Sequence, residues 1–174
     1  MQIPQIDRKK ALIVVDVQKG FLDTRNKYVV ANILELLKTT LYDRYVAAIF
    51  HAEKGSLWEK QQDWTFPIGE KTNIEPAIAV ALEKLHPITV EKETRSVFKG
   101  IPNVAELLRT SGIEEVHIVG FETHDCILAT AFESFDSGFF TYVIEECCES
   151  TDADMHAHGL ALLRRQNMTN HSAV

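Results

Sequence analysis

Short apolar runs alternate with segments of helical periodicity along most of the chain. The apolar runs are rich in β-branched and aromatic residues, which is typical of buried strands. They cover residues 11–16, 45–50, 88–92, 115–120 and 139–144. Between them, apolar residues recur at three- and four-residue spacing and predict helices. These cover residues 29–40, 76–85, 103–111, 126 to a stop at Gly138, and about 152–165 with Thr151 or Asp152 as a cap.

This alternation of strands and helices predicts an α/β fold. Right-handed crossovers between successive strands give a mostly parallel sheet with helices on both faces. We therefore expect a three-layer α/β/α, Rossmann-like doubly wound domain of five or six strands. The sequence does not decide whether a sixth strand forms, because residues 168–174 fit either a short strand or a frayed tail. No shift of composition divides the chain, so residues 1–174 are predicted to form one domain.

The segment from 52 to 75 interrupts the alternation and shows no clear periodicity. It contains both tryptophans, Trp58 and Trp64, together with Phe66. A long irregular segment inside a compact domain is usually functional or poorly ordered. The aromatic content favours either a lid over the protein's own pocket or a contact with a second copy. Because exposed apolar patches usually mark interfaces, we expect a homo-oligomer, a dimer or larger.

Composition and charge narrow the range of partners. The formal net charge is −7, and no basic run is long enough to bind nucleic acid or an anionic membrane. The three cysteines, of which Cys147 and Cys148 are adjacent, form neither a disulfide framework nor a metal-ligand spacing. We expect these two to be buried, unreactive thiols that follow the fifth strand. No signal sequence or membrane span is evident, so a reduced, cytoplasmic protein without a cofactor is expected.

Three polar residues stand at or just beyond the carboxyl ends of predicted strands: Asp16, Lys92 and Cys126. In a doubly wound sheet these ends lie along one edge, where ligands bind. Cys126 also begins the helix after the fourth strand, and a helix N-terminus favours thiolate over thiol. Two of the three have a structural alternative, since Asp16 fits a turn cap and a free cysteine is often a small core residue.

Together the three residues suffice for acyl transfer. A carboxylate accepts the thiol proton, a nearby ammonium favours both anions, and backbone N–H groups at the turn bind an oxyanion. A nucleotide-binding α/β protein is a weaker alternative, because no glycine-rich phosphate loop follows any predicted strand.

Three stretches of the chain resemble the isochorismatase-like cysteine hydrolases, outside their nicotinamidase branch. The first is Val14-Val15-Asp16-Val17-Gln18-Lys19-Gly20-Phe21, and the second is Val90-Glu91-Lys92 with Ser96-Val97-Phe98. The third is Gly120-Phe121-Glu122-Thr123-His124-Asp125-Cys126 with Thr130-Ala131. Their order and spacing fit over about 140 residues, from residue 10 to residue 150.

The resemblance implies roles for these residues. Asp16 would be the general base, Cys126 the nucleophile and Lys92 the cation that supports them. A cis peptide between Phe121 and Glu122 would direct the Glu122 N–H, with that of Cys126, at an oxyanion. Members hydrolyse small amides, ureido or carbamoyl compounds through a thioester intermediate, and they commonly form oligomers. The alternative is a catalytically silent member that binds a small molecule or acts as a scaffold.

The chain departs from the nicotinamidase pattern after the second strand. Nicotinamidases carry a metal site of Asp and two His there, whereas this chain has His51 with no second histidine nearby. We expect no metal, and we interpret His51 as a pocket residue, with a solvent-facing structural histidine as the alternative. The aromatic residues of loops near the active edge complete the expected pocket for a small substrate: Phe21, Trp58, Trp64 and Phe98.

Overall fold

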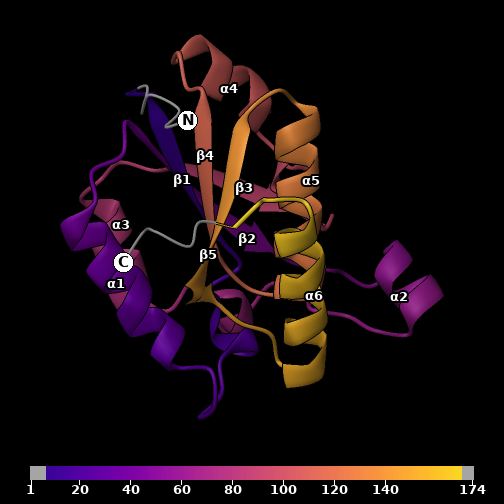
Figure 1. The fold of residues 1–174 in the computed structure, drawn as a ribbon. Helices are drawn as coiled ribbons and strands as arrows, with labels where there is room; N and C mark the ends of the chain where they lie inside the picture. Colours follow the sequence, from indigo (N-terminus) through magenta and orange to yellow (C-terminus); the bar gives the residue numbers. More distant parts are fainter. Residues whose placement is uncertain (1–6, 170–174) are drawn as a thin grey trace.

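The computed structural model describes residues 7–169 and contains a five-stranded sheet in which all paired strands are parallel. The strand order is β3-β2-β1-β4-β5, with β1 in the centre (Figure 1). The strands are β1 Lys10–Val15, β2 Arg44–Phe50, β3 Ile88–Lys92, β4 Glu115–Gly120 and β5 Phe140–Cys148. The chain order reverses between β1 and β4, and this reversal opens a crevice at the carboxyl ends of the strands.

Helices cover both faces of the sheet, so the predicted three-layer α/β/α fold is confirmed (Figure 1). Helices α1 and α3 pack on one face, and α4, α5 and α6 pack on the other. The bounds are α1 Tyr28–Thr39, α2 Leu57–Gln62, α3 Pro76–Glu83, α4 Val104–Thr110, α5 Leu128–Asp136 and α6 Ala153–Arg165. None of the helices between residues 7 and 169 is long and apolar enough to cross a membrane.

Strand β1 explains why the first apolar run is continuous. Ala11, Ile13 and Val15 pack under α4, α5 and α6, whereas Leu12 and Val14 pack under α1 and α3. All five side chains are buried. A strand covered on both faces has no solvent-facing position, so polar residues are absent until the strand ends at Asp16.

The connection between β4 and α5 differs from the prediction. Residues Thr123–Ile127 form one turn of π-helix, and regular α-helix begins only at Leu128. The four-residue spacing of Ile127, Ala131 and Phe135 predicts one buried face, but only the first two are buried, and Phe135 is 59% exposed. Two steps of four residues rotate about 80° past a straight stripe. The core position is taken instead by Ser134, whose hydroxyl accepts a hydrogen bond from Thr141.

Two further sequence expectations are corrected. Strand β5 continues to Cys148, so Cys147 and Cys148 lie within it rather than after it, and both are buried as expected. The segment from 52 to 75 contains the short helix α2, which Ser56 caps by accepting a hydrogen bond from the Glu59 N–H.

At the C-terminal end of the described residues, Thr169 forms a single parallel bridge with Val143. The remainder of the predicted sixth strand lies outside the described residues.

Gly120 ends β4 where the chain turns toward Cys126. Its φ is +120°, and a Cβ added there would lie 2.0 Å from the Val15 carbonyl oxygen. Gly138 also has a positive φ, +92°, but a Cβ there would meet nothing within 4 Å. Only Gly120 is therefore required by both conformation and space.

We predict that Gly120→Ala lowers the free energy of unfolding by more than about 2 kcal/mol, because the added methyl group overlaps rigid backbone. Gly138→Ala, the matched control, is predicted to cost only about 1 kcal/mol, from backbone conformation alone. Urea unfolding of the two variants measures both values. Equal losses would contradict the steric explanation.

Candidate active site

Asp16, Lys92 and Cys126 meet in one buried cluster at the carboxyl edge of the sheet. Lys92 Nζ lies 2.7 Å from Asp16 Oδ2 and 3.5 Å from Cys126 Sγ. The same ammonium donates a hydrogen bond to the Thr94 carbonyl at 3.1 Å. The Lys92 and Asp16 side chains are almost fully buried, and Cys126 is 6% exposed. The three residues that the sequence grouped are therefore in contact.

Strand ends hold each member in place. Asp16 follows β1 directly, with a φ of +52° and its N–H bonded to the Ala48 carbonyl of β2. Lys92 is the last residue of β3, and its carbonyl accepts a hydrogen bond from the His51 N–H. Cys126 lies in the π-turn after β4. The carboxyl ends of β1 and β3 and the turn after β4 thus converge at the crevice beside β1.

Burial and charge set the protonation of the cluster. Burial raises the pKa of the Cys126 thiol well above its usual value, and the adjacent Asp16 carboxylate raises it further. Burial also raises the pKa of Asp16, although the Lys92 ammonium opposes this. For Lys92, burial opposes the charge, but Asp16 and Cys126 outweigh it and raise its pKa. The thiol form of Cys126 is therefore favoured at rest, opposite to the thiolate expected from a helix N-terminus.

The connection from β5 to α6 braces the turn that carries Cys126. The Thr123 N–H donates to the Glu149 carbonyl and to the Ser150 hydroxyl, at 3.2 and 3.0 Å. The Thr123 hydroxyl lies 2.8 Å from Nδ1 of His156 on α6. Sequence reasoning missed these bracing residues, although Glu149 and Ser150 also follow a strand end and the same rule could have found them.

The Phe121–Glu122 peptide is cis, as the resemblance implies. The bond lies directly before the π-turn, so the Glu122 backbone and the Cys126 backbone border the same crevice. Their use as oxyanion donors stays a prediction.

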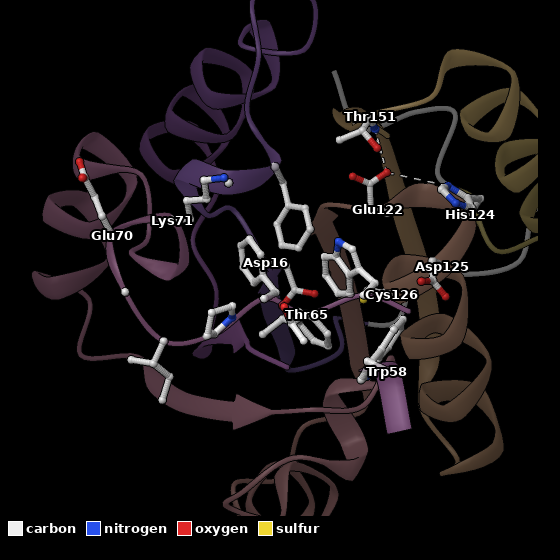
Figure 2. Close-up of a pocket in the computed structure, with 18 residues that line it drawn as sticks. Asp16, Trp58, Thr65, Glu70, Lys71, Glu122, His124, Asp125, Cys126 and Thr151 are labelled. Atoms are coloured by element: carbon white, nitrogen blue, oxygen red, sulfur yellow. Dashed lines mark hydrogen bonds and ion pairs between the residues drawn. The ribbon is translucent and has the colours of Figure 1, made fainter. Parts of the chain in front are cut away.

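A cavity of about 840 Å³ opens beside the cluster and is lined by both Asp16 and Cys126 (Figure 2). Of the predicted pocket residues, Phe21, Trp58 and Trp64 line it. Sequence reasoning missed two further aromatic rings in the wall, those of Phe50 and Phe66, and the side chain of Glu122. Both tryptophans thus face the protein's own cavity, which corresponds to the lid alternative. Assembly with a second copy stays a prediction.

Two predicted pocket residues lie elsewhere. His51 faces a neighbouring hollow, with Nδ1 3.6 Å from Oε1 of Glu93. Successive side chains of an extended segment point to opposite sides, so Phe50 faces the cavity while His51 does not. Phe98 is 8% exposed and packs in the core with its ring centroid 6.0 Å from that of Phe139.

Gln18 anchors the aromatic wall, and sequence reasoning gave it no role. Its buried amide accepts from the Phe50 N–H at 2.9 Å and donates to the Phe50 carbonyl at 2.8 Å. It also donates to the Thr72 carbonyl at 2.7 Å. One side chain therefore ties the end of β2 to the loop that carries Phe66. A buried amide with all these bonds satisfied is a rigid support.

Between residues 7 and 169, no group of three or more His, Cys, Asp or Glu side chains is arranged to hold a metal ion.

Comparison with known proteins adds family evidence. A model of the isochorismatase domain matches residues 10–172. An uncharacterized isochorismatase family protein of Bacillus subtilis, YrdC, is 30% identical over 146 residues, which cover 81% of this chain and 74% of that protein. The maleamate amidohydrolase of Pseudomonas putida is 24% identical over 110 residues, 63% of this chain. The match spans 51% of that enzyme's length.

Solved structures share the fold. The nicotinamidase PncA of Bacillus subtilis superposes with a TM-score of 0.77 at 21% identity, over 93% of this chain and 98% of that one. An isochorismatase-like hydrolase of Alkaliphilus metalliredigens gives a TM-score of 0.74 at 17% identity, over 95% and 92% of the two chains.

The buried ion pair generates a prediction about stability. Lys92→Met is expected to lower the free energy of unfolding by about 3 kcal/mol, because it leaves the Asp16 carboxyl buried without its cation. The double variant Asp16→Asn with Lys92→Met removes both charges and is expected to recover most of that loss. Urea unfolding of the single and double variants gives the coupling free energy between Asp16 and Lys92. A double variant as unstable as Lys92→Met alone would show that charge is not the cause.

Proposed function

The chain belongs to the isochorismatase family, and from that premise we propose that it is a cysteine hydrolase. Its substrates are small amides, ureido or carbamoyl compounds, and it cleaves their C–N bond through a covalent thioester. The observation that carries the proposal is the position of Lys92 Nζ, 2.7 Å from Asp16 and 3.5 Å from Cys126 beside an open cavity. The amidohydrolase and nicotinamidase among the similar proteins favour an amide-type bond.

The first half of the reaction forms the thioester. Asp16 removes the Cys126 proton as Sγ attacks the carbonyl carbon, so a C–S bond forms and the carbonyl π pair moves to oxygen. The N–H groups of Glu122 and Cys126 stabilise that oxyanion. When the tetrahedral intermediate collapses, the C–N bond breaks and protonated Asp16 gives its proton to the leaving nitrogen.

The second half returns the resting state. Asp16 takes a proton from water as the water oxygen attacks the thioester carbon. Collapse breaks the C–S bond, the proton passes from Asp16 to the sulfur, and the acid product leaves. Lys92 stays charged throughout, because its role is to stabilise the carboxylate and the developing thiolate. Asp16 alternates between base and acid, which suits its raised pKa.

A catalytically silent protein is the second candidate. The observation that favours it is the burial of Cys126, which holds the thiol protonated and only 6% exposed. Such a protein would bind a small molecule in the same cavity without turnover. A screen of small amides and ureido compounds for released ammonia separates the two, since only the hydrolase releases ammonia.

We predict that Cys126→Ala lowers ammonia release at least about a thousandfold, because the alanine provides no nucleophile. The fold should persist, since the change removes a single buried atom. Cys147→Ala is the matched control: it deletes the same atom from another buried cysteine, which packs in the core under α1. A Cys126→Ala protein with full activity would exclude Cys126 from the mechanism, and loss of activity in Cys147→Ala would point to a folding defect.

We also predict that ammonia release survives exhaustive chelation. The proposed mechanism uses only Asp16, Lys92, Cys126 and backbone N–H groups, and His51 has no partner histidine after β2. The measurement compares initial rates before and after dialysis against EDTA. A loss of activity that zinc, manganese or iron restores would overturn the metal-independent mechanism.

A further inference from the structure

We propose that Glu122 makes this cavity selective for amide substrates that also carry a positively charged nitrogen group. The inference rests on the proposed function, since it names the substrate class of the same site. It follows from the unpaired Oε1 of Glu122 in the cavity wall and from the aromatic rings that line the same cavity.

The side chain of Glu122 lines the cavity next to the nucleophile turn (Figure 2). Its Oε2 accepts a hydrogen bond of 2.7 Å from the Thr151 N–H. Its Oε1 is buried and has no hydrogen-bond partner among the residues that the structure describes. Leaving a buried acceptor unpaired is costly, so a donor delivered by a ligand would be stabilising. The terminal torsion of glutamate is soft, so a small rotation can turn this oxygen into the cavity.

Glu122 carries a negative charge in neutral solution. Burial raises the pKa of its carboxyl to about 6, while the hydrogen bond from Thr151 opposes the rise. His124 Nδ1 lies 3.9 Å from Oε2, beyond hydrogen-bond distance, and bonds to the Ser150 hydroxyl instead. The carboxylate is therefore held by a backbone N–H, and His124, at ion-pair rather than hydrogen-bond distance, compensates its charge only when the imidazole is protonated.

The two other acids near Cys126 already have cations. Asp16 Oδ2 is paired with Lys92, although Asp16 Oδ1 is also buried without a hydrogen-bond partner among the described residues, and Asp125 forms an ion pair with Arg95. A charged ligand would gain little from either, because each carboxylate is already compensated. Glu122 is thus the acid of this part of the cavity that has charge to offer.

The outer part of the cavity carries two more charged residues. Glu70 is exposed and lies 3.4 Å from Lys19. Lys71 is exposed, and Figure 2 shows it on the opposite side of the cavity from Glu122. Charges at an exposed rim are screened by solvent, whereas the buried Glu122 carboxylate is screened much less.

The rest of the wall suits a cation as well. Five rings line the cavity, those of Phe21, Phe50, Trp58, Trp64 and Phe66. Aromatic faces attract positive charge. The wall already binds cations of the chain itself: Lys92 Nζ lies 4.9 Å from the Phe50 centroid, and the Arg95 guanidinium lies 4.4 Å from that of Trp58. A carboxylate ligand would meet ring faces and Glu122, both of which repel it.

The test compares three small amides of similar length that differ only in their far end. β-Alaninamide ends in an ammonium, butanamide in a methyl group and succinamate in a carboxylate. Binding is followed by intrinsic fluorescence, because the chain has only two tryptophans and both line the cavity. Full-length protein with Cys126→Ala is used at about pH 7.5, where Glu122 is ionised and no turnover disturbs the titration.

We expect β-alaninamide to bind at least about tenfold more tightly than butanamide, and succinamate to bind most weakly. Adding Glu122→Gln should remove most of this preference, because glutamine keeps the acceptor for Thr151 but has no charge. Glu70→Gln is the matched control, with the same chemical change at the exposed rim, and should keep the preference.

Three results would overturn the proposal. They are equal binding of the three amides, a preference that survives Glu122→Gln, and no fluorescence response to any of them. The readout is independent of turnover, so it separates this inference from the proposed function. If the wild-type protein releases no ammonia yet shows the expected ranking, hydrolysis fails and the selectivity stands. If the wild-type protein releases ammonia but does not show the ranking, the proposed hydrolase activity stands and Glu122 is not its specificity residue.

Discussion

The buried ion pair between Asp16 and Lys92 is the constraint on which the site depends. Two charges taken out of water are costly unless they pair closely, and here the pair is 2.7 Å long and almost fully buried. The two residues end β1 and β3, which are separated in the sheet by β2. The Lys92 side chain must therefore reach across the end of β2 to meet Asp16. This requirement sets the relative position of three strand ends and leaves the ammonium facing Cys126.

Much of this arrangement could be predicted from the sequence, for one physical reason. In a parallel sheet buried on both faces, the strands are mainly apolar, so a polar residue at a strand's carboxyl end marks the crevice. That rule placed Asp16, Lys92 and Cys126 together without any measured distance. The same rule would have found Glu149 and Ser150, had it been applied to the fifth strand. The strand's end was predicted too early there, because Glu145 and Glu146 interrupt its apolar run while the backbone continues in the sheet.

The sequence could not predict the direction in which a side chain points or how deeply it is buried, because neither follows from its position along the chain. His51 and Phe98 lie near the carboxyl edge of the sheet, but their side chains point away from the cavity. A shift of one residue along an extended segment is enough to turn a side chain to the other side. The π-turn before α5 adds a residue that periodicity does not reveal. The protonation state of Cys126 could not be predicted from the sequence either. A helix N-terminus favours the thiolate, but burial beside Asp16 raises the pKa of the thiol, and the amount of burial is known only from the fold.

These features together separate the chemistry of the site from its selectivity. In the proposed mechanism, proton transfer from Cys126 to Asp16 moves charge within the cluster without changing its total, so the cluster itself offers a ligand little net charge. The strand ends hold this neutralised core rigidly. The cavity wall has a different origin, since Phe66 and Trp64 lie on the segment that Gln18 ties to β2, and Glu122 follows β4. Changes in that wall can alter which molecules bind while the core keeps its geometry. Because we propose the backbone N–H of Glu122 as an oxyanion donor and its side chain as the selective group, Glu122 is the residue at which the two proposals meet.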